Sequence, residues 1–196
     1  KKKFRFYMNK ELSLLVTLAL LMAVIVIVSN YLVQFPIEHY NLEEVLTYGA
    51  FTYPITFLIT DLANRTYGIR IARWIVIIGF IVGILLTVFI STNFSDLISI
   101  RIAIGSGLAF FIAQNLDIQI FDKLRKNINW YIAPFVSSIV GSIIDTFLFF
   151  FVAFYQTGIP WVSLAFGDLT VKILITLVML VPFKMLLTTF KEKNTS

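Results

Sequence analysis

The sequence predicts an all-α membrane protein: one polytopic domain, residues 1–196, in which six transmembrane helices form a bundle. Three observations predict this class. Hydrophobic residues make up 59% of the chain, and a mean hydropathy of +0.89 leaves too little polar surface for a soluble domain of this length. Several apolar runs are long enough to cross a bilayer. Charged residues, 14% of the total, cluster between those runs.

The first predicted span, about 12–33, follows a segment with five basic residues. A secretory signal peptide also begins with basic residues before an apolar run. This run is too long for a signal peptide, it lacks a small-residue cleavage site, and further apolar runs follow. Because crossing the hydrocarbon core takes roughly 20 residues, we expect six spans, at about 12–33, 45–61, 72–91, 98–120, 131–155 and 162–187.

Basic residues alternate strictly between the segments that connect these spans. The N-terminal segment, the second loop, the fourth loop and the C-terminal tail carry Lys and Arg, whereas the first, third and fifth loops carry none. By the positive-inside rule, this alternation places both termini in the cytoplasm. The net charge of +5 therefore reports orientation in a lipid bilayer, and we expect no nucleic-acid partner.

Small residues recur at a spacing of four, which lets membrane helices approach closely; the pairs are Ala19 and Ala23, Gly79 and Gly83, Gly105 and Ala109, and Ser137 and Gly141. Three spans followed by three spans would also place two halves in opposite orientations. The segments GAFTYPITFLITD and IAPFVSSIVGSIIDT each combine Pro, a hydroxyl residue and a later Asp. The sequence thus leaves a 3+3 inverted repeat open.

The stretch from Gly49 to Gly68 begins as an apolar run and ends in polar and charged residues, Asp61 and Arg65 among them. Pro54 lies inside the run and has no N–H, so a neighbouring group or a ligand must satisfy the carbonyl that it frees. Broken helices that end in charge tend to line a pathway. We therefore expect this stretch to belong to a functional site.

Asp145 is the sharpest single signal, because it lies roughly 20 Å into the fifth span. A carboxylate at that depth costs several kcal/mol unless it faces water, a partner or a ligand. Ser138, Gly141 and Ser142 share its helical stripe. Asp145 either bonds a neighbouring helix as a purely structural group or lines a transport pathway, and we favour the pathway.

Other polar residues also fall on shared helical faces. Asn30 and Gln34 are four apart on the first span, and Gln114 and Asp117 are three apart on the fourth. Arg65 follows Asp61 by one helical turn near the cytoplasmic end. Arg65 with Asp61 or Asp117 would form either a structural clamp or an inner gate whose ion pairs break on opening.

Two basic residues, Arg101 and Lys172, lie at or within the outer parts of spans. Lys172 follows Asp168 by one helical turn. It either snorkels to water, pairs with Asp168, or serves an outer vestibule.

Enzyme classes find little support. The chain has no Cys, and His39 is its only His, which excludes thiolate nucleophiles and imidazole metal clusters. The Gly-x-Gly-Asp signature of intramembrane aspartyl proteases is missing. The segment from Ile104 to Gly107 comes near the Gly-x-Ser-Gly of rhomboid proteases, but Ile104 replaces the first Gly and no His lies in a span. We expect no catalysis, no metal and no cofactor.

Several motifs, in order from about Ser29 to Pro182, resemble the queuosine precursor transporter family, also called the vitamin uptake transporter family. The motifs are SNYLVQFP, GAFTYP, FLITDLANRTYG, RIAIGSGLAFFIAQNLD, WYIAP and SIIDTFLFFFVAF. The family pattern matches polar residues on separate spans: Asn30, Gln34, Asp61, Arg65, Arg101, Gln114, Asp117, Ser138, Asp145 and Lys172. The connecting loops of this chain are short for the family.

The resemblance implies an importer of 7-deazaguanine bases in the bacterial inner membrane, working by alternating access. Its ligands would be 7-cyano-7-deazaguanine, 7-aminomethyl-7-deazaguanine and queuine. A carboxylate, from Asp145 or Asp117, would accept the two neighbouring donors of a guanine-like edge, and Gln114 or Asn30 would bond its carbonyl. Aromatic candidates to stack on the rings are Tyr53, Phe110 and Trp130.

Two other functions remain open from the sequence. A six-helix binding subunit would need a separate ATP-driven module, and Ala19 and Ala23 could form its docking face. A scaffolding membrane protein would have no use for buried acids. The sequence also leaves open whether a second copy of the chain is a partner in a homodimer.

Overall fold

The computed structural model describes residues 2–38, 45–86, 89, 97–126 and 129–195. These residues form α-helices and no named strand; one isolated bridge joins Pro36 to Thr47. The all-α prediction is confirmed for this part of the chain. The helices are α1 (Lys2–Leu32), α2 (Gly49–Thr52), α3 (Pro54–Tyr67), α4 (Ile69–Leu86), α5 (Leu97–Leu124), α6 (Ile132–Phe154) and α7 (Trp161–Thr195).

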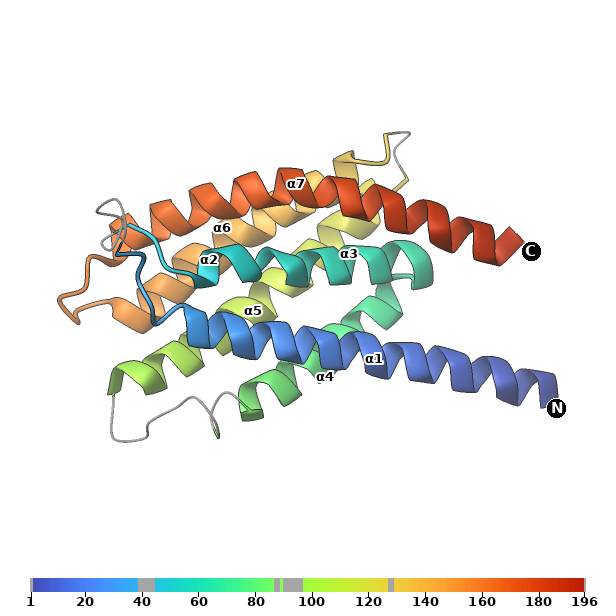
Figure 1. Cartoon of the computed structure of the whole chain (residues 1–196), viewed down its shortest axis with the longest axis horizontal. Helices are drawn as coiled ribbons and strands as arrows, with labels where there is room; N and C mark the ends of the chain where they lie inside the picture. The colour runs from blue at the N-terminus through green and yellow to red at the C-terminus, as the bar shows by residue number, and fades with distance from the viewer. Residues whose placement is uncertain (1, 39–44, 87–88, 90–96, 127–128, 196) are drawn as a thin grey trace.

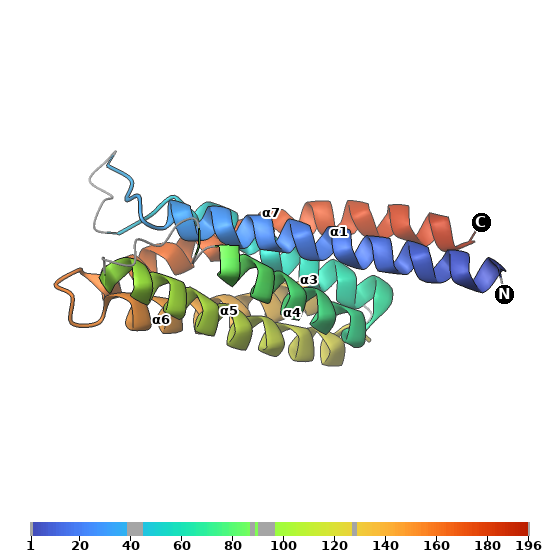
Figure 2. The same cartoon turned by 90° about the horizontal axis from the view of Figure 1, so that it is seen from below.

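The helices form an elongated bundle in which the two termini lie at the same end (Figure 1). The turn between α3 and α4, the end of α5 and the start of α6 lie at that end too. The view turned by 90° shows the same grouping (Figure 2). The segments that the sequence identified as basic thus gather at one end, while α6 ends and α7 begins at the other.

Within the described residues, four helical segments are long and apolar enough to cross a membrane. They are Leu15–Leu32, Leu97–Leu124, Ile132–Phe154 and Trp161–Thr188. Of the remaining helices, α3 has 14 residues and α4 has 18. The count of six spans, the cytoplasmic termini and the inverted repeat stay predictions.

The predicted span 45–61 needs correction at both ends. Residues 45–48 are not helical, because Thr47 bridges Pro36 and Tyr48 N–H donates to the Phe35 carbonyl at 3.1 Å. At the other end, α3 continues through the polar residues to Tyr67 and stops where Gly68 takes a φ of +85°. Glycine tolerates that left-handed conformation without a Cβ penalty, which makes it a common helix terminator.

Pro54 divides this stretch into two helices. It occupies the first turn of α3, where the missing N–H would have had no helical partner in any case. Hydroxyl groups bond backbone carbonyls on both sides of the break: Thr52 Oγ1 donates to the Gly49 carbonyl at 3.2 Å and Thr56 Oγ1 to the Tyr53 carbonyl at 2.7 Å. The break therefore places Tyr53 between two helices in the middle of the bundle.

Small residues bring α1 and α4 together. A Cβ added to Gly79 would lie 2.6 Å from Met22 Cγ, and one added to Gly83 would lie 3.7 Å from the Ala23 Cα. Ala19 and Ala23 are buried in this contact, each 1% exposed. The interpretation of these two alanines as a docking face for an ATP-driven module is therefore wrong, because α4 already covers them.

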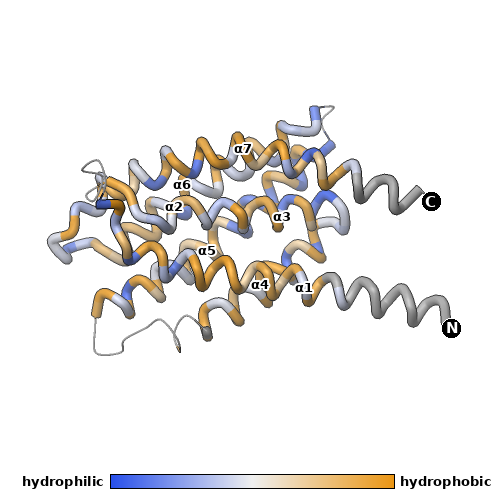
Figure 3. The backbone as a smooth tube through the Cα atoms, in the orientation of Figure 1, coloured by the Kyte–Doolittle hydropathy of each residue, from blue (hydrophilic) through white to orange (hydrophobic). Residues whose placement is uncertain are grey.

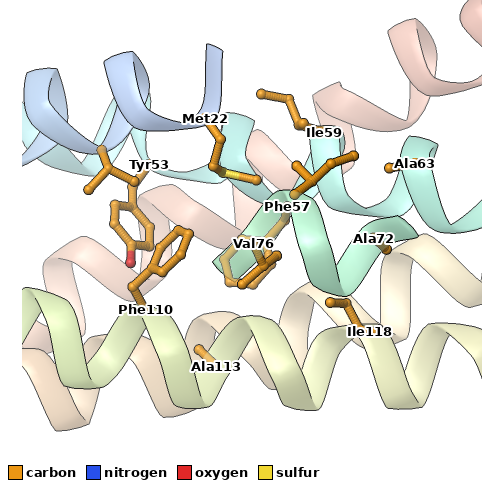
Figure 4. Close-up of a cluster of buried hydrophobic side chains, with 12 residues drawn as sticks. Met22, Tyr53, Phe57, Ile59, Ala63, Ala72, Val76, Phe110, Ala113 and Ile118 are labelled. Atoms are coloured by element: carbon orange, nitrogen blue, oxygen red, sulfur yellow. The ribbon is translucent and has the colours of Figure 1, made fainter. Parts of the chain in front are cut away.

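The core behind this contact is apolar. Met22, Phe57, Val76 and Phe110 are buried together and come from α1, α3, α4 and α5 (Figure 4). Tyr53 packs edge-on against Phe110, with ring centroids 6.3 Å apart. The helix break is thus anchored in the largest apolar cluster of the described chain, which fixes the position of the Tyr53 ring.

The outer surface is apolar as well. On α7, Leu174, Val178, Val181 and Met185 are each more than half exposed, and hydrophobic positions run along most of the helices in Figure 3. A soluble protein rarely leaves such a surface in water. This surface fits contact with lipid, as the composition predicts.

Gly167 of α7 provides a test of the packing at the end of the bundle. A Cβ at this position would lie 1.8 Å from the Val45 carbonyl oxygen, so Gly167→Ala must displace backbone. Overpacking of this kind costs about 1–3 kcal/mol, and we expect a lower thermal unfolding midpoint in detergent. Ser163→Ala, at an exposed position on the same helix, is the control. Equal midpoints for the two variants would contradict the close contact.

Candidate functional site

Asp145, Lys172 and Asp168 form a buried charge cluster between α6 and α7. Lys172 Nζ lies 2.9 Å from Asp145 Oδ2 and 2.6 Å from Asp168 Oδ2. It also donates to Thr146 Oγ1 at 3.1 Å, and Thr146 Oγ1 donates to Asp168 Oδ2 at 2.9 Å. The predicted pairing of Lys172 with Asp168 is confirmed. Snorkelling to water is wrong, because the lysine is only 3% exposed.

This cluster borders a cavity that we call the central cavity. Asn30 of α1, Tyr53 at the helix break, Ser106 of α5 and the three charged side chains line it. The Ser106 hydroxyl donates to Asn30 Oδ1. The Lys172 ammonium lies 4.7 Å from the centre of the Tyr53 ring, within cation–π range. Four helices and the break between α2 and α3 thus contribute polar or aromatic groups to one point inside the bundle.

Two polar atoms at the central cavity make no hydrogen bond of acceptable geometry with the described residues. They are Asp145 Oδ1 and the Tyr53 hydroxyl, which are buried and lie close to each other. The cavity holds about 20 Å³, room for roughly one water molecule. Buried polar atoms without partners are costly, so a ligand that supplied partners there would gain affinity. In this conformation, the cavity is closed to anything larger than water.

A larger hollow, which we call the end cavity, lies at the end of the bundle away from the termini. It holds about 370 Å³, within the range of small-molecule sites. Gln34, Thr47 and Ser99 are its polar lining residues, and Val33 lines both this cavity and the central one. The Gln34 amide donates to the Asn30 carbonyl at 3.3 Å. The two cavities are therefore neighbours that a shift of α1 could join.

A second cluster of acids lies elsewhere in the bundle, where α3, α5 and α6 meet. Ser138 Oγ donates to Asp61 Oδ2 at 3.2 Å, and Ser137 Oγ to Asp61 Oδ1 at 3.4 Å. Hydrogen bonds join α3 to α5 on both sides of this point, from Thr60 Oγ1 to Gln114 Oε1 at 2.7 Å and from Asn64 Nδ2 to the Ile118 carbonyl at 3.0 Å, and they hold Asp61 beside Asp117. Asp61 and Ser138 also line a small hollow of about 10 Å³, which we call the Asp61 cavity.

Asp61, Asp117 and Asp145 do not share one cavity. Asp145 belongs to the central cavity, and Asp61 lines the separate Asp61 cavity. Asp117 lines none of the three cavities. The face of α3 and α5 that carries the two acids packs against α6 instead of against α1. The acids thus divide into a site with a lysine and a site without one.

Neither reading of Arg65 as an ion-pair partner holds among the described residues. Its guanidinium donates to the Arg125 carbonyl, and Arg125 Nη1 donates to the Asn64 carbonyl at 2.9 Å. Arg125 also pairs with Asp122 at 2.8 Å. These contacts tie the ends of α3 and α5 together. A clamp between these helix ends therefore exists, but it differs from the predicted one, because it uses backbone carbonyls and not an Asp61 or Asp117 carboxylate.

Two further candidates have structural partners. Arg101 donates to the Val152 carbonyl at 3.0 Å and to the Tyr155 carbonyl at 2.8 Å, which satisfies the end of α6. Gln114 accepts from Thr60 Oγ1 at 2.7 Å and donates to Thr56 Oγ1 at 2.9 Å. Neither side chain lines the central cavity.

Of the aromatic candidates, Tyr53 reaches the central cavity. Phe110 lies in the apolar core, and the Trp130 ring faces Lys184 Nζ at 5.2 Å. The prediction from the sequence did not include Ser106 and Thr146 as hydrogen-bond partners within the site. Ser106 was weighed only as a nucleophile, and Thr146 gave a weak signal, since a hydroxyl next to an intramembrane acid is common.

Comparison with known proteins agrees with a membrane location for the chain. Residues 47–187 match a family model described as "Putative vitamin uptake transporter". The "Queuosine precursor transporter" of Escherichia coli is 32% identical over 195 residues, which cover 90% of this chain and 87% of that protein. The "Probable queuosine precursor transporter" of Haemophilus influenzae is 35% identical over 81% of this chain and 79% of its own length. The relative of the same name in Bacillus subtilis is 30% identical over 68% of each chain. No solved structure matches the chain.

Proposed function

The chain belongs to the vitamin uptake transporter family, and from that membership we propose that it imports queuosine precursors across the bacterial inner membrane. It is a multi-pass membrane protein. The observation that supports a binding role most directly is the central cavity, where Asp145 Oδ1 and the Tyr53 hydroxyl are buried side by side and make no well-aligned hydrogen bond. These two oxygen atoms are available to hydrogen-bond the polar edge of a flat ligand.

The substrates in this proposal are 7-cyano-7-deazaguanine, 7-aminomethyl-7-deazaguanine and queuine. Their guanine-like edge places an N–H beside an amino group, and a carboxylate accepts both. Asp145 serves this edge. The Asn30 side-chain amide bonds the carbonyl of the base while Ser106 holds its oxygen, and the rings lie between Tyr53 and Phe149, which also lines the cavity. The cation of an aminomethyl ligand is compensated by Asp168.

We propose alternating access because of the sizes of the two neighbouring cavities. A hollow of about 20 Å³ cannot hold a bicyclic base, whereas the end cavity of about 370 Å³ can. The base first enters the end cavity and then reaches Asp145 when α1 moves away from α5, α6 and α7. The basic segments at the opposite end support six crossings with cytoplasmic termini, and a 3+3 repeat would relate the two halves.

Uptake of labelled 7-cyano-7-deazaguanine by cells that cannot synthesise it tests the proposal. Expression of the chain is expected to make these cells accumulate label, and no gain on expression would overturn the function. Purified protein in liposomes without any ATPase should also carry the base, since α4 covers the surface that a motor subunit was expected to use. Chromatography of the internal label should recover the base chemically unchanged, because we propose transport without catalysis.

A further inference from the structure

The Asp61–Asp117 pair is a second site of unusual chemistry, distinct from the central cavity. The Asp117 side chain is fully buried, and neither of its carboxylate oxygens receives a hydrogen bond of acceptable geometry from the described residues. Asp61, 2% exposed, accepts from Ser137 and Ser138 and lies within reach of Asp117. Asn64 Oδ1, one turn along α3 from Asp61, is also buried without a donor.

No cation compensates this pair in the described part of the chain. The ion pairs found there join Arg125 to Asp122, and Lys172 to Asp145 and Asp168. Arg65 of α3 and Arg125 of α5 bond backbone carbonyls, and Arg70 and Arg73 of α4 are exposed. The groups that face the pair from α6 are the hydroxyls of Ser137 and Ser138, which do not titrate. Helix α7 adds Thr176 to the Asp61 cavity, and it does not titrate either.

Two ionised carboxylates cannot remain in contact in a low-dielectric interior, because like charges at that distance repel strongly and each loses its hydration. One proton shared between them removes the repulsion and one of the two buried charges: the protonated carboxyl donates to its ionised neighbour, and the Ser137 and Ser138 hydroxyls bond the charge that remains. The serine hydroxyls already occupy Asp61 oxygens, which leaves the unpartnered Asp117 oxygens as the other half of the shared bond. The geometry therefore requires a proton or another small cation at this position.

We propose that the Asp61–Asp117 pair is the proton-binding site that couples uptake to the proton gradient. This inference rests on the proposed transport function. In the closed conformation, the pair holds its proton. When water reaches Asp61 through the Asp61 cavity, which holds about 10 Å³ between α3, α6 and α7, the carboxylates become hydrated separately and the proton leaves as hydronium. At the central cavity, by contrast, Lys172 lies between Asp145 and Asp168 and compensates part of their charge, so the need for a proton is greater at the Asp61–Asp117 pair.

The first experiment needs no substrate. Infrared spectra of the purified protein are expected to contain the carbonyl stretch of a buried, protonated carboxylic acid, and Asp117→Asn should remove it. Asp122→Asn, which removes a partly exposed carboxylate from the same helix, should leave the band in place. Asp117→Asn should unfold at the same temperature as the parent or higher, because the amide mimics the protonated acid. If it does not fold, Asp61→Asn provides the same comparison.

The second experiment uses liposomes with the membrane potential clamped at zero. With an outside pH one unit below the inside, one proton per molecule can sustain at most about tenfold accumulation of 7-cyano-7-deazaguanine. The parent and Asp122→Asn should approach this ratio, whereas Asp117→Asn should reach an internal concentration equal to the external one and no higher.

The outcomes separate the two proposals. If the parent protein takes up no base with or without the pH gradient, the transport proposal is contradicted, while the infrared band still decides the proton site. Absence of the band in the parent overturns the proton site, whatever the uptake. Accumulation that follows a sodium gradient, ignores the pH gradient and is lost in Asp117→Asn also overturns it, since the pair would then hold sodium.

Discussion

Asp145→Asn is expected to weaken binding of 7-cyano-7-deazaguanine by about 10–100-fold, because a charged acceptor becomes a neutral amide that presents one acceptor and one donor. The donor would face the N–H groups of the base and repel them. Asp145 Oδ1 is the buried carboxylate oxygen that makes no hydrogen bond of acceptable geometry at the central cavity, so this substitution weakens the acceptor that we assign to the guanine-like edge. Ligand-induced thermal stabilisation of the purified protein measures the loss.

Asp122→Asn is the matched control for this variant. Asp122 pairs with Arg125 at the end of α5, with side chains about 30% exposed, and lines neither the central nor the end cavity. Its ligand-induced shift should equal that of the parent. If Asp145→Asn binds the base as tightly as the parent, the assignment of Asp145 to the base is wrong and the site lies elsewhere.

Lys172→Met is expected to destabilise the protein by about 3–5 kcal/mol, the usual cost of removing one partner from a buried ion pair. The lysine compensates two carboxylates at once, at 2.9 Å from Asp145 and 2.6 Å from Asp168. The methionine retains the length of the stem but leaves both acids buried with no cation. The apparent free energy of unfolding in mixed micelles, from a denaturant titration, measures the effect.

A second substitution shows whether charge is the cause. In the Lys172→Met background, Asp168→Asn removes one of the two uncompensated acids and should recover part of the lost stability. Lys184→Met is the control, because this exposed lysine on the same helix has a cation–π contact with Trp130, worth less than about 1 kcal/mol. A Lys172→Met protein as stable as Lys184→Met would show that the cluster is not electrostatically coupled.

Tyr53 connects the helix break to this charge cluster. Pro54 ends α2 and starts α3, so the tyrosine lies where the backbone can bend. One side of its ring packs on Phe57 and Phe110, with centroids 6.4 and 6.3 Å away, and Lys172 Nζ faces the ring at 4.7 Å. A change in the tilt of α2 would therefore move the ring relative to the lysine and the Asp145 carboxylate.

The sequence by itself determined the class of the protein, the approximate limits of its long helices, and the intramembrane residues that require partners. Hydropathy and helical length are local properties, so 98–120 and 131–155 fall close to α5 and α6. The depth of a charged residue in its span can also be read from the sequence, and that singled out Asp145 before any partner was known. The polar end of α3 was harder, because Gly68 and not polarity decides where that helix stops.

Only the tertiary structure decided which groups meet. Asp61 and Asp145 carry the same charge on similar helices, yet one faces serines and a second acid while the other faces Lys172. Helix rotation makes that difference, and close contacts such as those of Gly79 with Met22 and Gly141 with Phe57 fix the rotation. These contacts join residues far apart in the chain, and a pattern of three or four residues carries no information about them.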